Sequence, residues 1–116
     1  MRNILLVEDD FLIAYDLKAQ LEEAGMAVLG PVASNDAAHA LLGQGDVHAA
    51  ILDMDLGGIT SFPTAERLQA RGIPFVFVSG NDQDELHGGL AGSPVHTKPV
   101  HFPRLVKQLE QMIGPS

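Results

Sequence analysis

An apolar run in the middle of the chain ends abruptly in two carboxylates. Ala49 to Leu52 are all apolar, Asp53 and Asp55 follow, and the pair Gly57-Gly58 then interrupts any regular structure. Such a run is typical of a strand buried on both faces of a parallel sheet. Open α/β folds bind their ligands just beyond the carboxyl ends of such strands. The pattern therefore places Asp53 at an edge of a sheet where chemistry can occur.

Apolar, strand-like runs alternate with helix-like segments along the whole chain. The expected strands cover residues 4–7, 26–32, 49–52, 73–79 and 95–97. The expected helices cover residues 11–24, 34–42, 64–70, 83–92 and 102–113, the second being capped by Ser34 or Asn35. Helix 83–92 is the weakest, because two interior glycines each destabilise it by about 1 kcal/mol relative to alanine. The alternation predicts βαβ units and a (βα)5 chain.

Composition excludes several classes of protein. A chain of 116 residues with 46% apolar and 19% charged residues predicts one globular domain over residues 1–116. No apolar run approaches the roughly 20 residues of a membrane span, the start does not resemble a signal peptide, and we expect a cytoplasmic protein without a membrane partner. The net charge is −8 and no basic run is present, so direct nucleic-acid binding is disfavoured. The absence of cysteine excludes disulfides and thiolate chemistry.

Three consecutive carboxylates, Glu8, Asp9 and Asp10, follow the first expected strand. Two unit charges about 4 Å apart repel by about 4 kcal/mol at an effective dielectric of about 20, unless a cation lies among them. The simpler alternative is that Asp10 caps the next helix while Glu8 and Asp9 face solvent. The stretch thus predicts either a cation site or a helix cap.

Two further strand ends carry polar side chains. Ser79 ends the fourth expected strand and either hydrogen-bonds an anion or caps residues 81–82. Lys98 follows the fifth strand and either joins the carboxylates or lies along the surface. The first reading is favoured for both, because a parallel sheet brings these ends together with Asp53. His39 is expected on the surface, and no second His or Cys is spaced to form a zinc site with it.

These residues make the sequence resemble the receiver domain of two-component response regulators, over the whole chain. The matching stretches are residues 6–10, Leu52-Asp53 with Leu56, Ser79-Gly80 and Lys98-Pro99. The resemblance implies a flavodoxin-like (βα)5 three-layer sandwich, with a parallel five-stranded sheet of order 2-1-3-4-5. It also implies a cis Lys98-Pro99 bond.

The resemblance implies a phosphorelay function in signal transduction. Asp53 would accept a phosphoryl group from a phosphohistidine, with Mg²⁺, and become an aspartyl phosphate. The metal would be bound directly by Asp9 and Asp53, by the Asp55 carbonyl and, through water, by Glu8. Lys98 and Ser79 would contact the phosphoryl oxygens.

The implied partner is a histidine kinase or a histidine phosphotransfer protein. The output would be protein contact or a phosphate sink, from a monomer or weak homodimer. The only catalysis expected is phosphoryl transfer to its own Asp53 and slow autodephosphorylation, not turnover of a substrate.

Several positions depart from the common receiver pattern. Gly57 replaces a proline, Thr60-Ser61 replaces Asp-Gly, and Val95 occupies the position of the aromatic switch residue. Residues 75–81 are similar to a subgroup of single-domain receivers with a Phe-Ala-Thr-Gly-type motif. How phosphorylation would be reported is therefore left open by the sequence.

Two other functions fit the sequence less well. A receiver-like interaction module that works without phosphorylation is the main alternative, and retention of Asp9, Asp53, Ser79 and Lys98 argues against it. A flavodoxin-like cofactor carrier is disfavoured, because residues 8–10 are acidic where a phosphate-binding loop needs glycines or hydroxyls.

Overall fold

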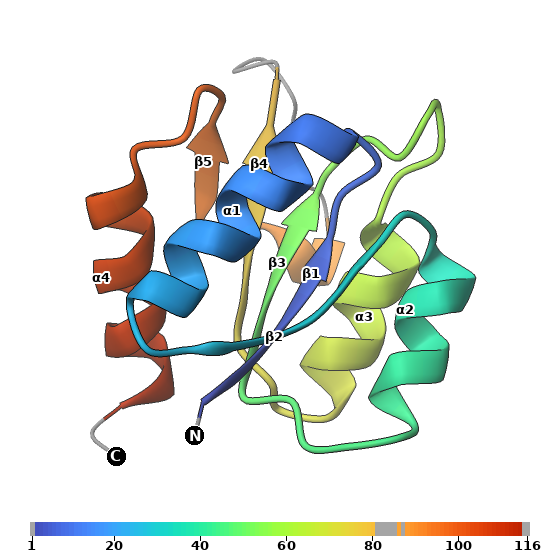
Figure 1. The fold of residues 1–116 in the computed structure, drawn as a ribbon. Helices are drawn as coiled ribbons and strands as arrows, with labels where there is room; N and C mark the ends of the chain where they lie inside the picture. Colours follow the sequence, from blue (N-terminus) through green and yellow to red (C-terminus); the bar gives the residue numbers. More distant parts are fainter. Residues whose placement is uncertain (1, 81–85, 87, 115–116) are drawn as a thin grey trace.

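A computed structural model describes residues 2–80, 86 and 88–114 (Figure 1). Its centre is a five-stranded parallel sheet of order β2-β1-β3-β4-β5. The strands are β1 (Asn3–Val7), β2 (Ala27–Val32), β3 (Ala49–Asp53), β4 (Phe75–Ser79) and β5 (Val95–Thr97). The strand order that the resemblance implied is confirmed.

Four α-helices cover the two faces of the sheet. They are α1 (Phe11–Glu23), α2 (Asn35–Leu42), α3 (Phe62–Ala70) and α4 (Phe102–Ile113). Figure 1 shows α1 and α4 on one face and α2 and α3 on the other, which makes three layers. The flavodoxin-like sandwich is thus confirmed.

The apolar runs of the sequence form two cores, one on each face of the sheet. Alternate residues of β1, β3 and β4 point to opposite faces, as a period of two requires. The core under α2 and α3 takes Leu5, Val7, Ala50, Leu52, Phe75 and Phe77. The core under α1 and α4 takes Ile4, Leu6, Ala49, Ile51, Val76 and Val78. Because both faces are buried, these strands are continuously apolar.

Polar side chains define where three helices begin. Asp10 Oδ1 accepts the N–H groups of Leu12 and Ile13 at the start of α1. Ser34 rather than Asn35 caps α2. His101 Nδ1 accepts the Arg104 N–H group at the start of α4. Each cap satisfies donors that the first helical turn leaves without partners.

Two expected helices differ from the structure. Helix α3 begins at Phe62 rather than Thr64, because Pro63 is compatible with a first helical turn, where its missing N–H group is not needed. Most of the expected helix 83–92 falls on residues 81–85 and 87, which lie outside the described residues. The part that is described forms a single 3₁₀ turn, η1 (Gly88–Leu90), and Gly88 has φ +61°, which an α-helix cannot contain.

Two peptide bonds in the described part of the chain are cis, Gly30-Pro31 and Lys98-Pro99. The second agrees with the expectation from the resemblance, and the first was not expected. Among the residues that the structure describes, no helix is long and apolar enough to cross a membrane.

Candidate functional site

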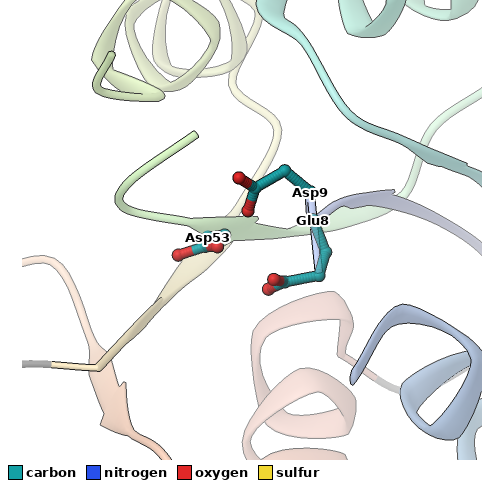
Figure 2. Close-up of side chains that lie close together, drawn as sticks. All are labelled: Glu8, Asp9 and Asp53. Atoms are coloured by element: carbon teal, nitrogen blue, oxygen red, sulfur yellow. The ribbon is translucent and has the colours of Figure 1, made fainter. Parts of the chain in front are cut away.

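Three carboxylates from two neighbouring strands meet at the carboxyl edge of the sheet. Glu8 and Asp9 follow β1, Asp53 ends β3, and the register pairs Val7 with Leu52. One oxygen from each side chain lies within 4.8 Å of the others, and Figure 2 shows the three side chains converging. We call Glu8, Asp9 and Asp53 the acidic cluster. Glu8 and Asp53 are buried, whereas Asp9 is exposed.

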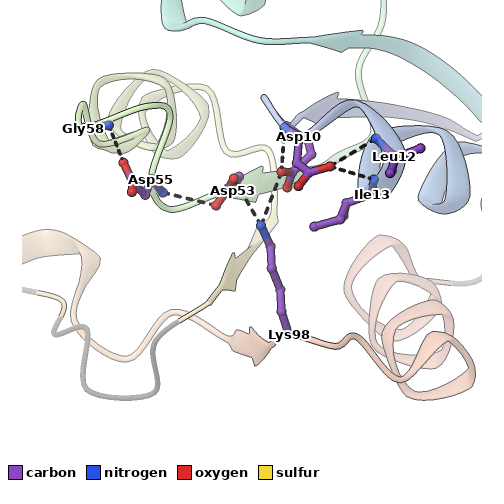
Figure 3. Close-up of polar contacts among 8 residues, drawn as sticks. Asp10, Leu12, Ile13, Asp53, Asp55, Gly58 and Lys98 are labelled. Carbon is purple, nitrogen blue, oxygen red and sulfur yellow. Dashed lines mark hydrogen bonds and ion pairs between the residues drawn. The ribbon is translucent and has the colours of Figure 1, made fainter.

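The ammonium of Lys98 lies between the two buried carboxylates. Its Nζ is 3.3 Å from Glu8 Oε1 and 3.3 Å from Asp53 Oδ2 (Figure 3). The Lys98 N–H group donates to the Ser79 carbonyl at 2.7 Å, which fixes the backbone that carries this side chain. The lysine therefore contacts the acidic cluster and does not lie along the surface.

The loop after β3 holds Asp53 by its backbone. The Asp55 N–H group donates to Asp53 Oδ1 at 3.2 Å, while the Asp55 carboxylate accepts the Gly58 N–H group at 2.7 Å (Figure 3). The Asp55 side chain is thus engaged within its own loop. It is the backbone N–H group of Asp55 that contacts the acidic cluster.

Asp10 has a structural role, and the alternative raised for residues 8–10 is right for Asp10 and for the exposed Asp9 but wrong for Glu8. Asp10 caps α1 as that alternative states, and its N–H group donates to Glu8 Oε1 at 3.1 Å. Glu8 does not face solvent but is buried. Its N–H group donates to the Val32 carbonyl and so extends the pairing of β1 with β2 by one residue. The helix cap and the acidic cluster therefore coexist.

Ser79 is buried at the same edge of the sheet. In the register of β3 and β4, Asp53 pairs with Val78, so that Ser79 lies one residue further along β4. The Ser79 carbonyl, as described, accepts from Lys98. The structure thus brings the ends of β1, β3, β4 and β5 to one edge, where the sequence placed them.

Burial and mutual repulsion perturb the charges of this site. Burial, together with the neighbouring Glu8 carboxylate, raises the pKa of Asp53 to about 6. Desolvation and Asp53 likewise raise the pKa of Asp9. Burial opposes the charge of Lys98, but Asp53 and Glu8 outweigh it and raise the pKa of that ammonium. With all groups ionised, three carboxylates and one ammonium leave a net charge of −2.

Comparison with known proteins identifies the family of the chain. The family model described as "Response regulator receiver domain" matches residues 4–110. The chain belongs to this family. A comparison with curated proteins found no match.

Solved receiver structures resemble this one over their full length. SdrG from Sphingomonas melonis Fr1 is 38% identical, with a TM-score of 0.83 and coverage of 98% of both chains. A BeF3-activated conformation of SdrG, from Pseudomonas melonis Fr1, has 38% identity, a TM-score of 0.80 and coverage of 97% and 96%. The receiver domain of the sensor histidine kinase PA1611 from Pseudomonas aeruginosa PAO1 shares the fold at 23% identity, with a TM-score of 0.82 and 98% coverage of both chains.

Family membership establishes the general function. The protein is a phosphoacceptor receiver of two-component signalling, the function that the sequence predicted. Receiver domains bind Mg²⁺ at an acidic site and interact with histidine kinases or phosphotransfer proteins.

The residues of this receiver fit a magnesium ion. One oxygen from each carboxylate of the acidic cluster lies within 4.8 Å of the others, and carboxylate oxygens are ligands that would hold Mg²⁺. Glu8 Oε2 is buried and has no hydrogen-bond partner among the described residues, which leaves it available to a metal-bound water. A divalent cation would also neutralise the net charge of −2.

One feature of the receiver was not predicted from the sequence, and one departure noted in the sequence has a counterpart in the backbone. His39 is half-buried rather than on the surface, and its Nε2 lies 3.1 Å from the hydroxyl of Thr64, which donates to Asn35 Oδ1 at 2.6 Å. Nothing in the spacing of these residues predicts a contact between two helices. Gly57 has φ +71°, a conformation that the proline usual in receivers cannot adopt. The glycine noted in the sequence thus has a backbone conformation that excludes proline at this position.

Proposed function

We propose that Asp53 is the phosphoryl acceptor of this receiver and that a phosphohistidine is its donor. The proposal rests mainly on the position of Asp53, which ends β3 between the Lys98 ammonium and the carboxylates of Glu8 and Asp9. A carboxylate oxygen of Asp53 attacks phosphorus, a P–O bond forms, and the P–N bond to the donor imidazole breaks. The imidazole leaves with the electron pair of that bond and takes up a proton, and the product is an acyl phosphate.

The surrounding residues have separate roles in this step. Lys98 gives up part of its pairing with Asp53 and neutralises a phosphoryl oxygen, because the new oxygens carry the charge that the carboxylate loses. The buried Ser79 hydroxyl donates a hydrogen bond to another oxygen. The Asp55 N–H group holds Asp53 Oδ1 and so orients the attacking carboxylate.

Mg²⁺ is the cofactor of the proposed site. Asp9 and Asp53 bind it directly, the Asp55 carbonyl is a third ligand, and Glu8 acts through water. When bound, the ion neutralises the developing charge on the phosphoryl oxygens. Asp10 stays outside this set because its carboxylate caps α1.

The proposed partners and oligomeric state follow from the role of phosphoryl acceptor. A histidine kinase or histidine phosphotransfer protein supplies the phosphoryl group, and a downstream protein responds to it. We propose a cytoplasmic monomer or weak homodimer whose only catalysis is on its own Asp53.

Intact-mass spectrometry after incubation with acetyl phosphate and Mg²⁺ tests this proposal. Wild type should gain the mass of one phosphoryl group, and Asp53→Asn should gain none. Asp10→Asn is the matched control, because asparagine keeps the cap of α1 and the adjacent acidic cluster is unchanged. Labelling of Asp53→Asn equal to wild type would exclude Asp53 as the acceptor, and lost labelling in Asp10→Asn would contradict the assigned role of Asp10.

A further inference from the structure

The loop between β3 and α3 carries part of the proposed metal site, because the Asp55 carbonyl belongs to it. We call residues 54–61 the β3–α3 loop. The Asp55 N–H group donates to Asp53 Oδ1, and the Asp55 carboxylate accepts the Gly58 N–H group (Figure 3). A shift of this loop would therefore move one proposed ligand of the metal and also release the carboxylate of the proposed acceptor.

The β3–α3 loop has an unusual amount of conformational freedom at its centre. Gly57 and Gly58 have φ +71° and +93°, in the left-handed region that glycine adopts without steric cost. Glycine loses more backbone entropy than any other residue when it is held in one conformation. The glycine pair also adjoins the acidic cluster, since a Cβ added to Gly57 would lie 3.7 Å from Asp9 Oδ2. A bond to this loop from another element would therefore help to keep its shape beside the site.

Such a bond comes from α2. The side-chain amide of Asn35 donates to the Thr60 carbonyl at 3.0 Å. Thr60 forms an antiparallel bridge with Asp55 on the opposite side of the loop. Between them, the Leu56 N–H group donates to the Ile59 carbonyl at 2.7 Å. Asn35 thus holds the side of the loop that pairs with the residue carrying the proposed metal ligand.

The amide of Asn35 is itself oriented by side chains of α2 and α3. Its Oδ1 accepts the hydroxyl of Thr64 at 2.6 Å, and that hydroxyl lies 3.1 Å from His39 Nε2. Because the Thr64 hydroxyl donates its proton to Asn35, its oxygen is left to accept from a protonated His39 Nε2. Thr64 is fully buried, so that this end of the network is shielded from water. The oxygen of the Asn35 amide therefore faces Thr64, and its nitrogen faces the β3–α3 loop.

We propose that Asn35 is a positioning residue of the phosphorylation site. It acts through the Thr60 carbonyl and keeps the β3–α3 loop in the conformation that presents the Asp55 carbonyl to Mg²⁺. Asn35 compensates in this way for Gly57, which leaves the loop without the constraint that the proline usual in receivers would give. The inference rests on the proposed function, because the metal site that Asn35 serves is proposed there.

Hydrogen exchange of the metal-free protein tests whether Asn35 holds the loop. In Asn35→Ala, the Asp55 and Leu56 N–H groups should exchange at least about threefold faster relative to N–H groups inside β1 and β3, because one hydrogen bond to the loop is lost. A loss of global stability alone would not single out the loop. Asn35→Asp should have the same effect, since its carboxylate still accepts from Thr64 but has no proton to donate to the loop.

Magnesium binding tests whether the held loop serves the site. Calorimetric titration should give Asn35→Ala a dissociation constant for Mg²⁺ about three- to tenfold above that of wild type, the factor that corresponds to one net hydrogen bond. Gln69→Ala is the matched control and should bind as wild type does, because it removes an amide-to-carbonyl bond of the same kind, from α3 to Gly89. Circular dichroism checks the folding of each variant.

The outcomes separate this proposal from the proposed function. Wild-type Mg²⁺ affinity in Asn35→Ala would overturn the positioning role, and so would wild-type exchange of the β3–α3 loop in Asn35→Asp. A wild-type protein that binds no Mg²⁺ would instead refute the proposed metal site. The exchange result is obtained without metal, so that it decides in either case whether Asn35 holds the loop.

Discussion

Asp53 is a buried carboxylate that shares one ammonium with a second buried carboxylate. Glu8 Oε1 and Asp53 Oδ2 are each 3.3 Å from Lys98 Nζ, while the exposed Asp9 adds a third negative charge. Burial, and after it the neighbouring Glu8 carboxylate, raise the pKa of Asp53 to about 6 despite the Lys98 ammonium. The site is therefore strained electrostatically until a cation binds, and this strain has measurable consequences.

The Asp53→Asn variant should be more stable than wild type at pH 7 without metal. The pKa of Asp53 is about 6 in the folded protein, and the unfolded value is near 3.9. The folded state therefore binds more protons, and stability is lost as pH rises from about 4 to 6. Asparagine does not ionise and so removes this loss. The free energy of unfolding of Asp53→Asn should therefore exceed that of wild type by a large amount at pH 7 and by a small amount at pH 4. Urea unfolding at both pH values measures it, with Asp46→Asn as an exposed control. A destabilised Asp53→Asn at pH 7 would contradict the account.

At the scale of elements, the ends of strands were easier to predict than the contacts between helices. The runs that became β1, β3 and β4 are apolar because both of their faces are buried. Glu8 directly follows β1, and Asp53 and Ser79 end β3 and β4. Such local signals are visible in a sequence. The start of α3 at Phe62 was missed because Ser61 makes no side-chain cap that would mark it. The fit of α2 against α3 depends on tertiary packing, which no local pattern encodes.

The network between α2 and α3 should stabilise the fold. Thr64 is fully buried, and its hydroxyl contacts both Asn35 and His39. Thr64→Val keeps the shape but leaves those two groups without this partner, which should lower the free energy of unfolding by about 1–3 kcal/mol. Thr60→Val is the matched control, because the Thr60 side chain is exposed. Urea unfolding compares the two variants, and equal midpoints would mean that the network contributes nothing.

At the scale of the whole molecule, strand order creates the site. Residues 8, 53 and 98 are far apart in the chain and meet because β1 neighbours β3 and β5 follows β4 at the same edge. Apolar runs do not reveal the order of strands, which was predicted only from the resemblance to receivers.

Magnesium should stabilise the whole fold, because its proposed site, the acidic cluster, exists only when the chain is folded. At a concentration about 100 times the dissociation constant, the gain is about 2.7 kcal/mol. The gain should shrink as pH falls through about 6, since protons then compete for Asp53. Thermal unfolding with and without Mg²⁺ measures it, and Asp9→Asn should lose most of the effect. An equal gain at pH 5 and pH 7.5 would show that the ion binds elsewhere.

The most direct test of the central claim is to locate the phosphoryl group on the wild-type protein. After incubation with acetyl phosphate and Mg²⁺, the acyl phosphate can be trapped by borohydride reduction and the peptides mapped by tandem mass spectrometry. The account predicts a single reduced residue, Asp53, and none when Mg²⁺ is chelated. Modification at Glu8 or Asp9 in place of Asp53, or at a residue outside the acidic cluster, would contradict it.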